Sequence, residues 1–202
     1  MIPGIVLAGG KSSRMGSPKA LLPIGSAGEN FFDRVTGTLL AAGVHDVVVV
    51  VGADAAAIRA GARPRSGVRI IDNPDYELGQ LTSLLAGLRA IDAGAAAALV
   101  TLIDVPLVSA ATVRKLITAR QESGAPIVRP VLNGRHGHPV IFGRELFGEL
   151  DCADRSQGAK AVVRAHAAEM LEITVDDEGA FADIDTPEEY EYLIRRGSAE
   201  PD

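Results

Sequence analysis

Five consecutive valines, Val47–Val51, constrain the fold of this chain more than any other feature. A run this apolar, with no polar residue at alternate positions, is expected for a strand that is covered on both faces. Strands of this kind occur in parallel sheets, whose crossover connections place helices on the two sides. The valine run therefore predicts a sheet buried between two layers of helices.

The rest of the chain alternates strand-like and helix-like segments. Repeated strand–helix–strand units imply right-handed crossovers and an α/β fold with a three-layer α/β/α sheet. Residues 133–138 interrupt this rhythm and predict a hairpin-like, non-parallel element in the second half. Strands are expected at residues 4–7, 47–51, 68–71, 98–102, 127–130, 139–142 and 171–175, and helices at 30–42, 55–60, 81–90, 110–121, 159–168 and 187–195.

Helix signals support two of these segments. Phe31, Val35, Leu39 and Leu40 recur at helical spacing and predict a core-facing stripe, with Gly43 as the stop. At the other end of the chain, the sequence Thr-Pro-Glu-Glu at 186–189 is an N-cap followed by Pro and by acidic residues in the first turn.

Length and composition narrow the class of protein. The 202 residues predict one domain, residues 1–196, and a polar tail, residues 197–202. A net charge of −6 gives no overall cationic field, so no nucleic-acid partner is expected. The single cysteine, Cys152, excludes an internal disulfide framework and a zinc site built from several cysteines. The apolar stretch 93–103 is too short to span a bilayer and no signal peptide is recognisable, so we expect a cytoplasmic protein without a membrane partner.

A glycine-rich basic loop follows the first predicted strand. Gly9, Gly10 and Gly16 allow a close approach of backbone to ligand, and Arg14 and Lys19 supply two cations. Exposed N–H groups and cations together suit the phosphates of a nucleoside triphosphate. The spacing matches neither a Walker A loop nor G-x-G-x-x-G. The alternative is an ordinary strand-to-helix turn with two solvated basic residues.

Carboxylates follow at two further points of the expected ligand-binding edge. Asp104 comes directly after the apolar run that ends near Leu102, where it is either a ligand of a hard cation or a cap of the following turn. Asp183 and Asp185 would lie on one side of an extended segment, and either could complete a metal site. We favour Asp185.

Three loops carry weaker signals. Backbone amides near Gly79, with Gln80 and Ser83, suit either a nucleotide or a simple helix cap. His136 and His138 have no third ligand nearby, so acceptor recognition or ordinary loop hydrogen bonding is favoured over zinc. The segment 154–160, which includes Asp154 and Arg155, either contacts an anionic second substrate or is a solvated loop.

Taken in order, these motifs resemble one family across residues 5 to about 193. The segment 7–23, Leu-Ala-Gly-Gly-Lys-Ser-Ser-Arg-Met-Gly-Ser-Pro-Lys-Ala-Leu-Leu-Pro, resembles the signature loop of the MobA/MocA-like nucleotidyltransferases, the molybdenum-cofactor nucleotidylyltransferases. Asp104-Val105-Pro106 resembles their D-x-P metal motif. The segments 137–139, 154–159 and 183–188 resemble motifs of the cytidylyltransferase branch, whereas Gly9-Gly10 is closer to the guanylyltransferase branch.

The resemblance implies a Rossmann-like mixed sheet of the glycosyltransferase-A type and a Mg²⁺-dependent reaction. An NTP, with CTP favoured over GTP, would react with a phosphorylated acceptor, molybdopterin, and release pyrophosphate. A molybdoenzyme or its chaperone is the implied protein partner. The implied site residues are Arg14, Lys19 and Asp104 for catalysis; Leu7, Ala8, Gly9, Gly10, Asn73, Gly79 and Ser83 for the nucleotide, with Arg14 and Lys19; Asp104 and Asp185 for the metal; and His138, Asp154 and Arg155 for the acceptor.

The charges predict how such a reaction would proceed. An ionised acceptor phosphate needs no strong general base, so in-line positioning and neutralisation of phosphate charge would supply the catalysis. The competing readings are a guanylyltransferase, a sugar-phosphate nucleotidyltransferase of the same fold, and a nucleotide-binding regulatory module without turnover. The presence of both Asp104 and Lys19 argues against the last.

Overall fold

The structure, a computed structural model, describes residues 1–12, 15–25 and 28–197, and within these ranges eight strands form one mixed sheet. The order is β10-β7-β9-β6-β1-β4-β5, with β8 pairing with β7 outside this path. Two short strands, β2 and β3, form a separate antiparallel ribbon. The strands are β1 Gly4–Ala8, β2 Pro23–Ile24, β3 Glu29–Asn30, β4 Val47–Val51, β5 Val68–Asp72, β6 Ala97–Leu102, β7 Ile127–Leu132, β8 Arg135–His136, β9 Val140–Gly143 and β10 Leu171–Thr174.

The sheet has a parallel half and a mixed half. Strands β6, β1, β4 and β5 are parallel neighbours, while β9 lies antiparallel between β6 and β7. The expected non-parallel element is present, because β7 turns back into β8 through Asn133 and Gly134, which have φ of 50° and 75°. Asn-Gly favours such a turn, since both residues tolerate positive φ. The three-layer mixed sheet predicted from the sequence is confirmed.

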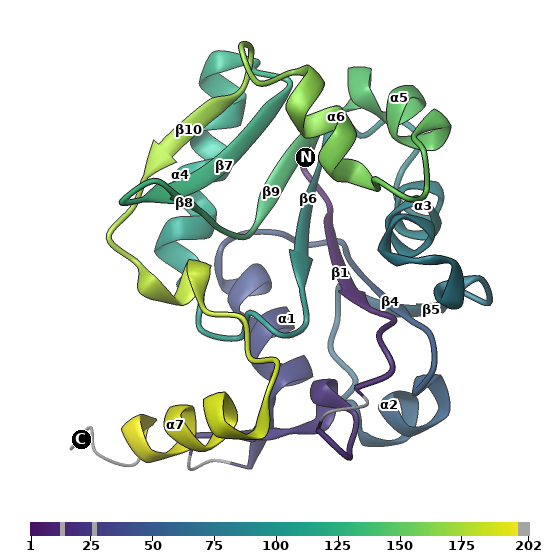
Figure 1. Cartoon of the computed structure of the whole chain (residues 1–202), viewed down its shortest axis with the longest axis vertical. Helices are drawn as coiled ribbons and strands as arrows, with labels where there is room; N and C mark the ends of the chain where they lie inside the picture. The colour runs from purple at the N-terminus through teal and green to yellow at the C-terminus, as the bar shows by residue number, and fades with distance from the viewer. Residues whose placement is uncertain (13–14, 26–27, 198–202) are drawn as a thin grey trace.

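The valine run packs against helices on both faces of the sheet. The side chains of Val47, Val49 and Val51 enter one core cluster, with residues of α1 and α4, and those of Val48 and Val50 enter a second, with residues of α3, α5 and α6 (Figure 1). Each fully buried valine contributes about 1.5–3 kcal/mol. The helices are α1 Phe31–Ala41, α2 Ala55–Gly61, α3 Gln80–Ala90, α4 Ala110–Ser123, α5 Phe147–Cys152, α6 Ala159–Ala165 and α7 Pro187–Gly197.

Some element boundaries and one packing assignment differ from the sequence prediction. Asn30 is the N-cap of α1 rather than its first residue, since its side chain accepts a hydrogen bond from the Asp33 backbone N–H. Phe31 leaves the stripe formed by Val35 and Leu39, because α1 also buries its N-terminal turn against a third core cluster. The six-residue helix α5 was not expected, and α6 ends at Ala165, three residues early.

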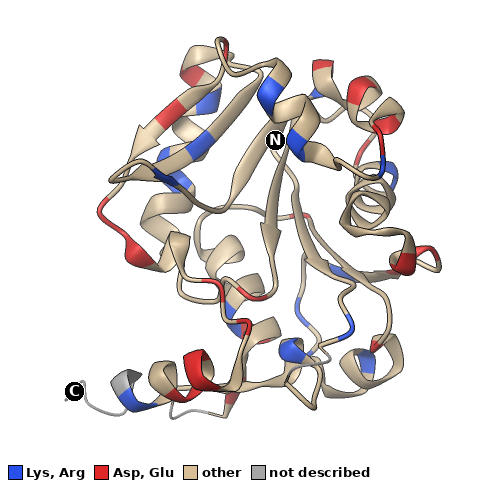
Figure 2. Cartoon of the chain, in the orientation of Figure 1, with Lys and Arg blue, Asp and Glu red and all other residues tan. Residues whose placement is uncertain are grey.

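The C-terminal segment returns to the N-terminal half of the chain. Helix α7 lies beside the N-terminal segment of the chain (Figure 1). There the Tyr190 hydroxyl donates to the Pro23 carbonyl of β2 at 2.9 Å, and the Tyr190 ring meets Phe31 edge-on, with centroids 6.1 Å apart. Acidic residues are frequent in α7 and in the segment before it (Figure 2). The predicted polar tail differs in that Gly197 ends α7, and residues 198–202 lie outside the described ranges. No helix within those ranges is long and apolar enough to cross a membrane.

Candidate active site

A cavity of about 210 Å³ lies at the carboxyl edge of the parallel strands. Strands β1, β4 and β6 all end there, so the loops that follow them supply its walls, as is typical for ligand sites of open α/β sheets. Its lining residues are Leu7, Ala8, Gly9, Gly10, Ser12, Lys19, Ala20, Asp54, Ile58, Tyr76, Gln80, Ser83, Leu102, Ile103 and Asp104.

The wall beneath the glycine-rich loop is polar and tightly built. A methyl group on Gly9 would lie 2.8 Å from the Ser83 hydroxyl oxygen, so any larger residue requires the Ser83 side chain or its helix to shift. The buried Asn73 side-chain amide donates to the Ser83 and Thr82 hydroxyl oxygens, both at 2.9 Å. These contacts hold the hydroxyl of Ser83 against the loop and leave the backbone of residues 9 and 10 facing the cavity.

The N-terminus of α3 lies at the same cavity. Gly79 is its N-cap, with φ of 106°, and the next residue, Gln80, lines the cavity. The first N–H groups of an 11-residue helix carry a partial positive charge that favours anions. Gln80 and Ser83 therefore line the same cavity as the glycine loop, and the role of Gly79 and Ser83 in nucleotide binding stays a prediction.

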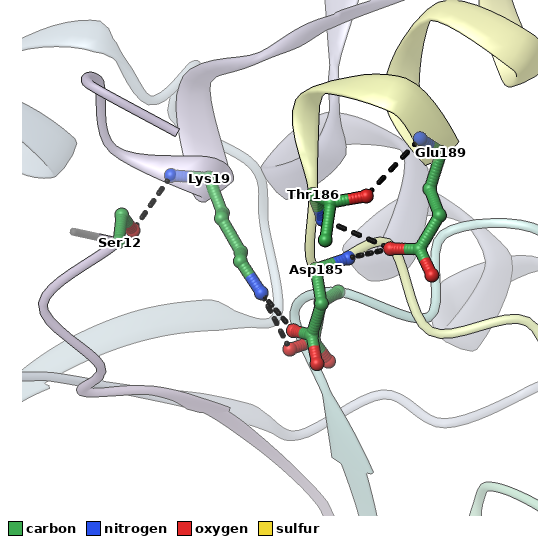
Figure 3. Close-up of polar contacts among 6 residues, drawn as sticks. Ser12, Lys19, Asp185, Thr186 and Glu189 are labelled. Carbon is green, nitrogen blue, oxygen red and sulfur yellow. Dashed lines mark hydrogen bonds and ion pairs between the residues drawn. The ribbon is translucent and has the colours of Figure 1, made fainter. Parts of the chain in front are cut away.

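Three charged side chains meet at the far end of the cavity. The ammonium group of Lys19 donates to a carboxylate oxygen of Asp104 at 3.2 Å and to one of Asp185 (Figure 3). The Lys19 side chain is only 14% exposed, whereas those of Asp104 and Asp185 are 21% and 49% exposed. Burial alone would lower the pKa of Lys19, but hydrogen bonds and charges from the two aspartates outweigh it, so the pKa is raised and the ammonium stays charged.

Hydrogen bonds to the backbone position the two segments that carry Lys19 and Asp185. The Lys19 N–H donates to the Ser12 hydroxyl oxygen at 3.0 Å. Asp185 precedes α7, whose first turn is closed by a reciprocal capping box: Glu189 accepts from the Thr186 N–H and the Thr186 hydroxyl accepts from the Glu189 N–H (Figure 3). Glu189 also accepts from the Asp185 N–H at 2.7 Å. Glu189 thus holds the backbone of Asp185, while the Asp185 carboxylate accepts a hydrogen bond from Lys19.

Asp183 lies near the pair without joining it. Burial, followed by repulsion from Asp104 and Asp185, raises the pKa of Asp183 above its usual value. The Ile184 N–H between the two candidates donates to the Asp104 carbonyl at 2.9 Å and so anchors the segment beside β6. Of the two carboxylates considered from the sequence, Asp185 is the one that shares a cation with Asp104.

The donor set fits a divalent metal ion. Two carboxylates already converge on one cation, the Lys19 ammonium, and the second oxygen of Asp104 is buried without a hydrogen-bond partner. Among the described residues, no three His, Cys, Asp or Glu side chains are grouped as a ready metal site. One or two carboxylates completed by phosphate oxygens and water is the ligand pattern that Mg²⁺ prefers.

The remaining predicted residues fall into three groups. Arg14 lies outside the described residues. His138 is half-buried, its buried Nδ1 has no hydrogen-bond partner, and desolvation lowers its pKa against an opposing effect of Asp104. Asp154 and Arg155 are exposed in the turn before α6 and do not line the cavity, so their role in acceptor binding stays a prediction.

Sequence reasoning missed Asp54 and Tyr76. Both line the cavity, and burial raises the pKa of Asp54. Asp54 follows β4 just as Asp104 follows β6, so its position after the valine run was the available signal. Tyr76 comes from a short 3₁₀ helix, residues Tyr76–Leu78, for which the sequence carries no comparable signal.

Residues 4–170 match the family model described as "MobA-like NTP transferase domain". This chain belongs to the MobA-like NTP transferase family. The match covers the glycine-rich loop, the walls of the cavity and Asp104, whereas Asp185 lies beyond its end.

Relatives of this MobA-like chain carry different names. A protein from Paenarthrobacter nicotinovorans named "Nicotine blue oxidoreductase" is 33% identical over 96% of each chain. A "Molybdenum cofactor guanylyltransferase" from Xanthomonas euvesicatoria is 30% identical, covering 95% of this chain and 93% of the relative. The relationship to nucleotidyltransferases is thus confirmed, while the cytidylyltransferase subtype expected from the motifs stays a prediction.

Two solved structures share the fold of this chain. The crystal structure of Rv0371c from Mycobacterium tuberculosis H37Rv superposes with a TM-score of 0.82 at 27% identity, covering 96% of this chain and 97% of that one. A second crystal structure of Rv0371c is titled as a complex with manganese; it gives a TM-score of 0.74 at 26% identity and covers 96% and 98%.

Proposed function

We propose that this chain transfers a nucleotidyl group from a nucleoside triphosphate to the phosphate of molybdopterin and releases pyrophosphate. The observation that carries the proposal is the Lys19 ammonium held between Asp104 and Asp185 at the end of a glycine-walled cavity. Phosphate charge, a hard cation and backbone donors are the complementary groups in this chemistry. The relative named molybdenum cofactor guanylyltransferase supports the choice of acceptor.

Backbone groups and side chains of the site have separate roles in binding the phosphates and neutralising their charge. Backbone N–H groups of Gly9 and Gly10 and the N-terminus of α3 bind phosphate oxygens, and Lys19 neutralises charge on them. Asp104 and Asp185 would hold a divalent ion, which would supply further neutralisation of phosphate charge. An acceptor phosphate is already ionised at neutral pH, so in-line placement replaces a general base.

Acceptor-dependent pyrophosphate release tests this proposal directly. The assay combines molybdopterin with CTP, GTP, ATP or UTP in the presence of Mg²⁺ or Mn²⁺. We expect release that requires both substrates and is lost in Asp104→Asn. Asp46→Asn is the matched control, because Asp46 pairs with Arg69 before the start of β4, at the opposite edge of the sheet. The absence of acceptor-dependent release with all four triphosphates contradicts the proposal.

We propose cytosine as the preferred base. The segments 137–139 and 154–159 support this choice through their resemblance to cytidylyltransferase motifs, against Gly9-Gly10 and the guanylyltransferase relative. A competition assay with CTP and GTP at equal concentration measures the preference. Efficient use of GTP with little use of CTP overturns the choice of base and leaves the reaction class intact.

A further inference from the structure

Lys19 lies between the two carboxylates to which the proposed function assigns a metal ion. Its ammonium group hydrogen-bonds both carboxylates that the proposed function assigns to the metal, and its side chain is 14% exposed (Figure 3). A magnesium ion binds oxygen at about 2.1 Å. An ion in contact with Asp104 and Asp185 would therefore lie within a few ångströms of the ammonium nitrogen, where two positive charges repel.

The phosphates of a bound nucleotide would offer the Lys19 side chain a second set of hydrogen-bond partners. Its backbone N–H is fixed by Ser12, but its four-carbon side chain has several rotatable bonds, and Lys19 also lines the cavity in which the phosphates would lie. Without nucleotide, a departing ammonium would exchange two carboxylates for solvent alone. With nucleotide, phosphate oxygens would accept the same hydrogen bonds.

We propose that Lys19 is an internal cation that holds the metal carboxylates in the substrate-free enzyme and exchanges places with the incoming metal ion when nucleotide binds. This inference rests on the proposed function and adds its regulation: metal and nucleotide binding are coupled through one side chain. The metal ion binds only to molecules in which Lys19 has left the carboxylates. The apparent metal affinity is therefore the intrinsic affinity multiplied by the fraction of such molecules. Coupling is reciprocal, so the metal raises nucleotide affinity by the same factor.

The test measures Mn²⁺ binding to the nucleotide-free protein by calorimetry or electron paramagnetic resonance. Lys19→Met removes the competing charge and keeps an unbranched side chain of similar length. We expect Lys19→Met to bind Mn²⁺ about tenfold more tightly than the wild type, within the usual range of coupling factors. A non-hydrolysable NTP analogue supplies phosphate ligands to the ion in both proteins, and it should tighten Mn²⁺ binding by a larger factor in the wild type than in Lys19→Met, because only the wild type also loses a competing ammonium group.

Two control variants separate exchange from a general charge effect. Lys19→Arg keeps a cation between the carboxylates, so its Mn²⁺ affinity should stay close to that of the wild type. Lys11→Met removes a lysine whose side chain is 60% exposed and paired with Glu77 at 2.6 Å, and it should leave Mn²⁺ binding unchanged. Asp104→Asn should abolish the tight Mn²⁺ site in a Lys19→Met background, which places the ion at these carboxylates.

Unchanged or weaker Mn²⁺ binding in Lys19→Met overturns the exchange. If Lys19→Met does not fold, Lys19→Gln and the rise of the unfolding temperature with added Mn²⁺ give the same comparison. The proposed function is tested separately, by acceptor-dependent pyrophosphate release of the wild type. An enzyme that turns over but shows no tightening in Lys19→Met refutes only the inference made here.

Discussion

Two ionic clusters with opposite charge arrangements lie in different parts of the molecule. In the cavity, one cation, Lys19, lies between two carboxylates, and both contacts are hydrogen bonds. On α1, one carboxylate, Asp33, lies between two guanidinium groups, with Arg63 Nε at 3.4 Å and Arg65 Nη2 at 3.8 Å. The Asp33 side chain is fully buried, and neither of its oxygens has a hydrogen-bond partner.

The difference separates an exchangeable cluster from a fixed one. Asp104 and Asp185 reach solvent, so another cation can replace Lys19 without leaving a buried charge unpaired. Asp33 has no access to solvent and depends entirely on its two arginines. We therefore expect substitutions in the first cluster to change catalysis and those in the second to change stability.

The largest effect that separates the clusters is expected at Asp104. Asp104→Asn preserves shape and hydrogen bonding but removes charge from the metal site, so turnover should fall about 10²-fold or more. The unfolding temperature should stay close to that of the wild type, because Lys19 keeps its contact with Asp185. Steady-state kinetics and a thermal melt check this. Normal turnover at saturating Mg²⁺ would show that Asp104 only caps its turn.

The second cluster should respond in stability alone. Replacing both Arg63 and Arg65 with Ala leaves Asp33 buried without a cation, at a cost of about 3 kcal/mol or more in the free energy of unfolding. Adding Asp33→Leu removes the stranded charge and should recover most of that loss. Urea unfolding measures both effects. Equal stability of the double and triple variants would mean that Asp33 does not depend on these arginines.

A smaller effect is expected at a close contact between two uncharged residues of the cavity wall, Gly9 and Ser83. Gly9→Ala places a methyl group 2.8 Å from the Ser83 hydroxyl oxygen, which should cost about 1–3 kcal/mol of stability. Ser83→Ala removes that oxygen, so Gly9→Ala with Ser83→Ala should be more stable than the sum of the single changes predicts. A double-mutant cycle on unfolding free energies gives the coupling. Strict additivity would contradict this close contact.

The smallest effect concerns a surface counterpart of the Lys19 cluster. His166 lies between Glu149 at 2.8 Å and Glu169 at 3.2 Å, and these carboxylates, Glu149 first, raise its pKa above the usual value. A raised folded-state pKa means that the stabilisation is complete below the unfolded pKa of about 6.5 and disappears as pH rises through the folded value. The unfolding temperature of the wild type should show this small loss, and His166→Gln should not. Identical pH profiles would show that these contacts contribute nothing.

The sheet and part of the site could be predicted because they depend on local pattern. The burial of Val47–Val51 on both faces was predicted from the valine run and is confirmed by the fold. The glycine loop lines the cavity at the carboxyl edge, and its role in binding phosphates stays a prediction. That Asp185 rather than Asp183 reaches Lys19 depends on a long-range return of the chain, anchored by the Ile184 N–H on the Asp104 carbonyl. No spacing within the 183–185 segment encodes that contact.

The burial of the Asp33 carboxylate could not be predicted from the sequence. Helical periodicity placed Val35 and Leu39 in the core correctly, but it gave no reason to bury Asp33 two positions earlier. The reason is the arginine pair at 63 and 65, which comes from the segment after α2 and packs against α1. Pairings between distant segments fix such side chains, and a single sequence does not record them.

The charged residues on the two outer strands of the sheet, β5 and β10, have a consequence for self-association. Strand β5 carries Arg69, which binds Asp46 and the Ala90 carbonyl, and strand β10 carries Glu172, which pairs with Arg129 at 2.6 Å. An unguarded edge strand can template the addition of another chain, and charged side chains on the edge oppose this. Both outer strands of this sheet thus carry an ion pair that makes edge-to-edge polymerisation of a valine-rich sheet unfavourable.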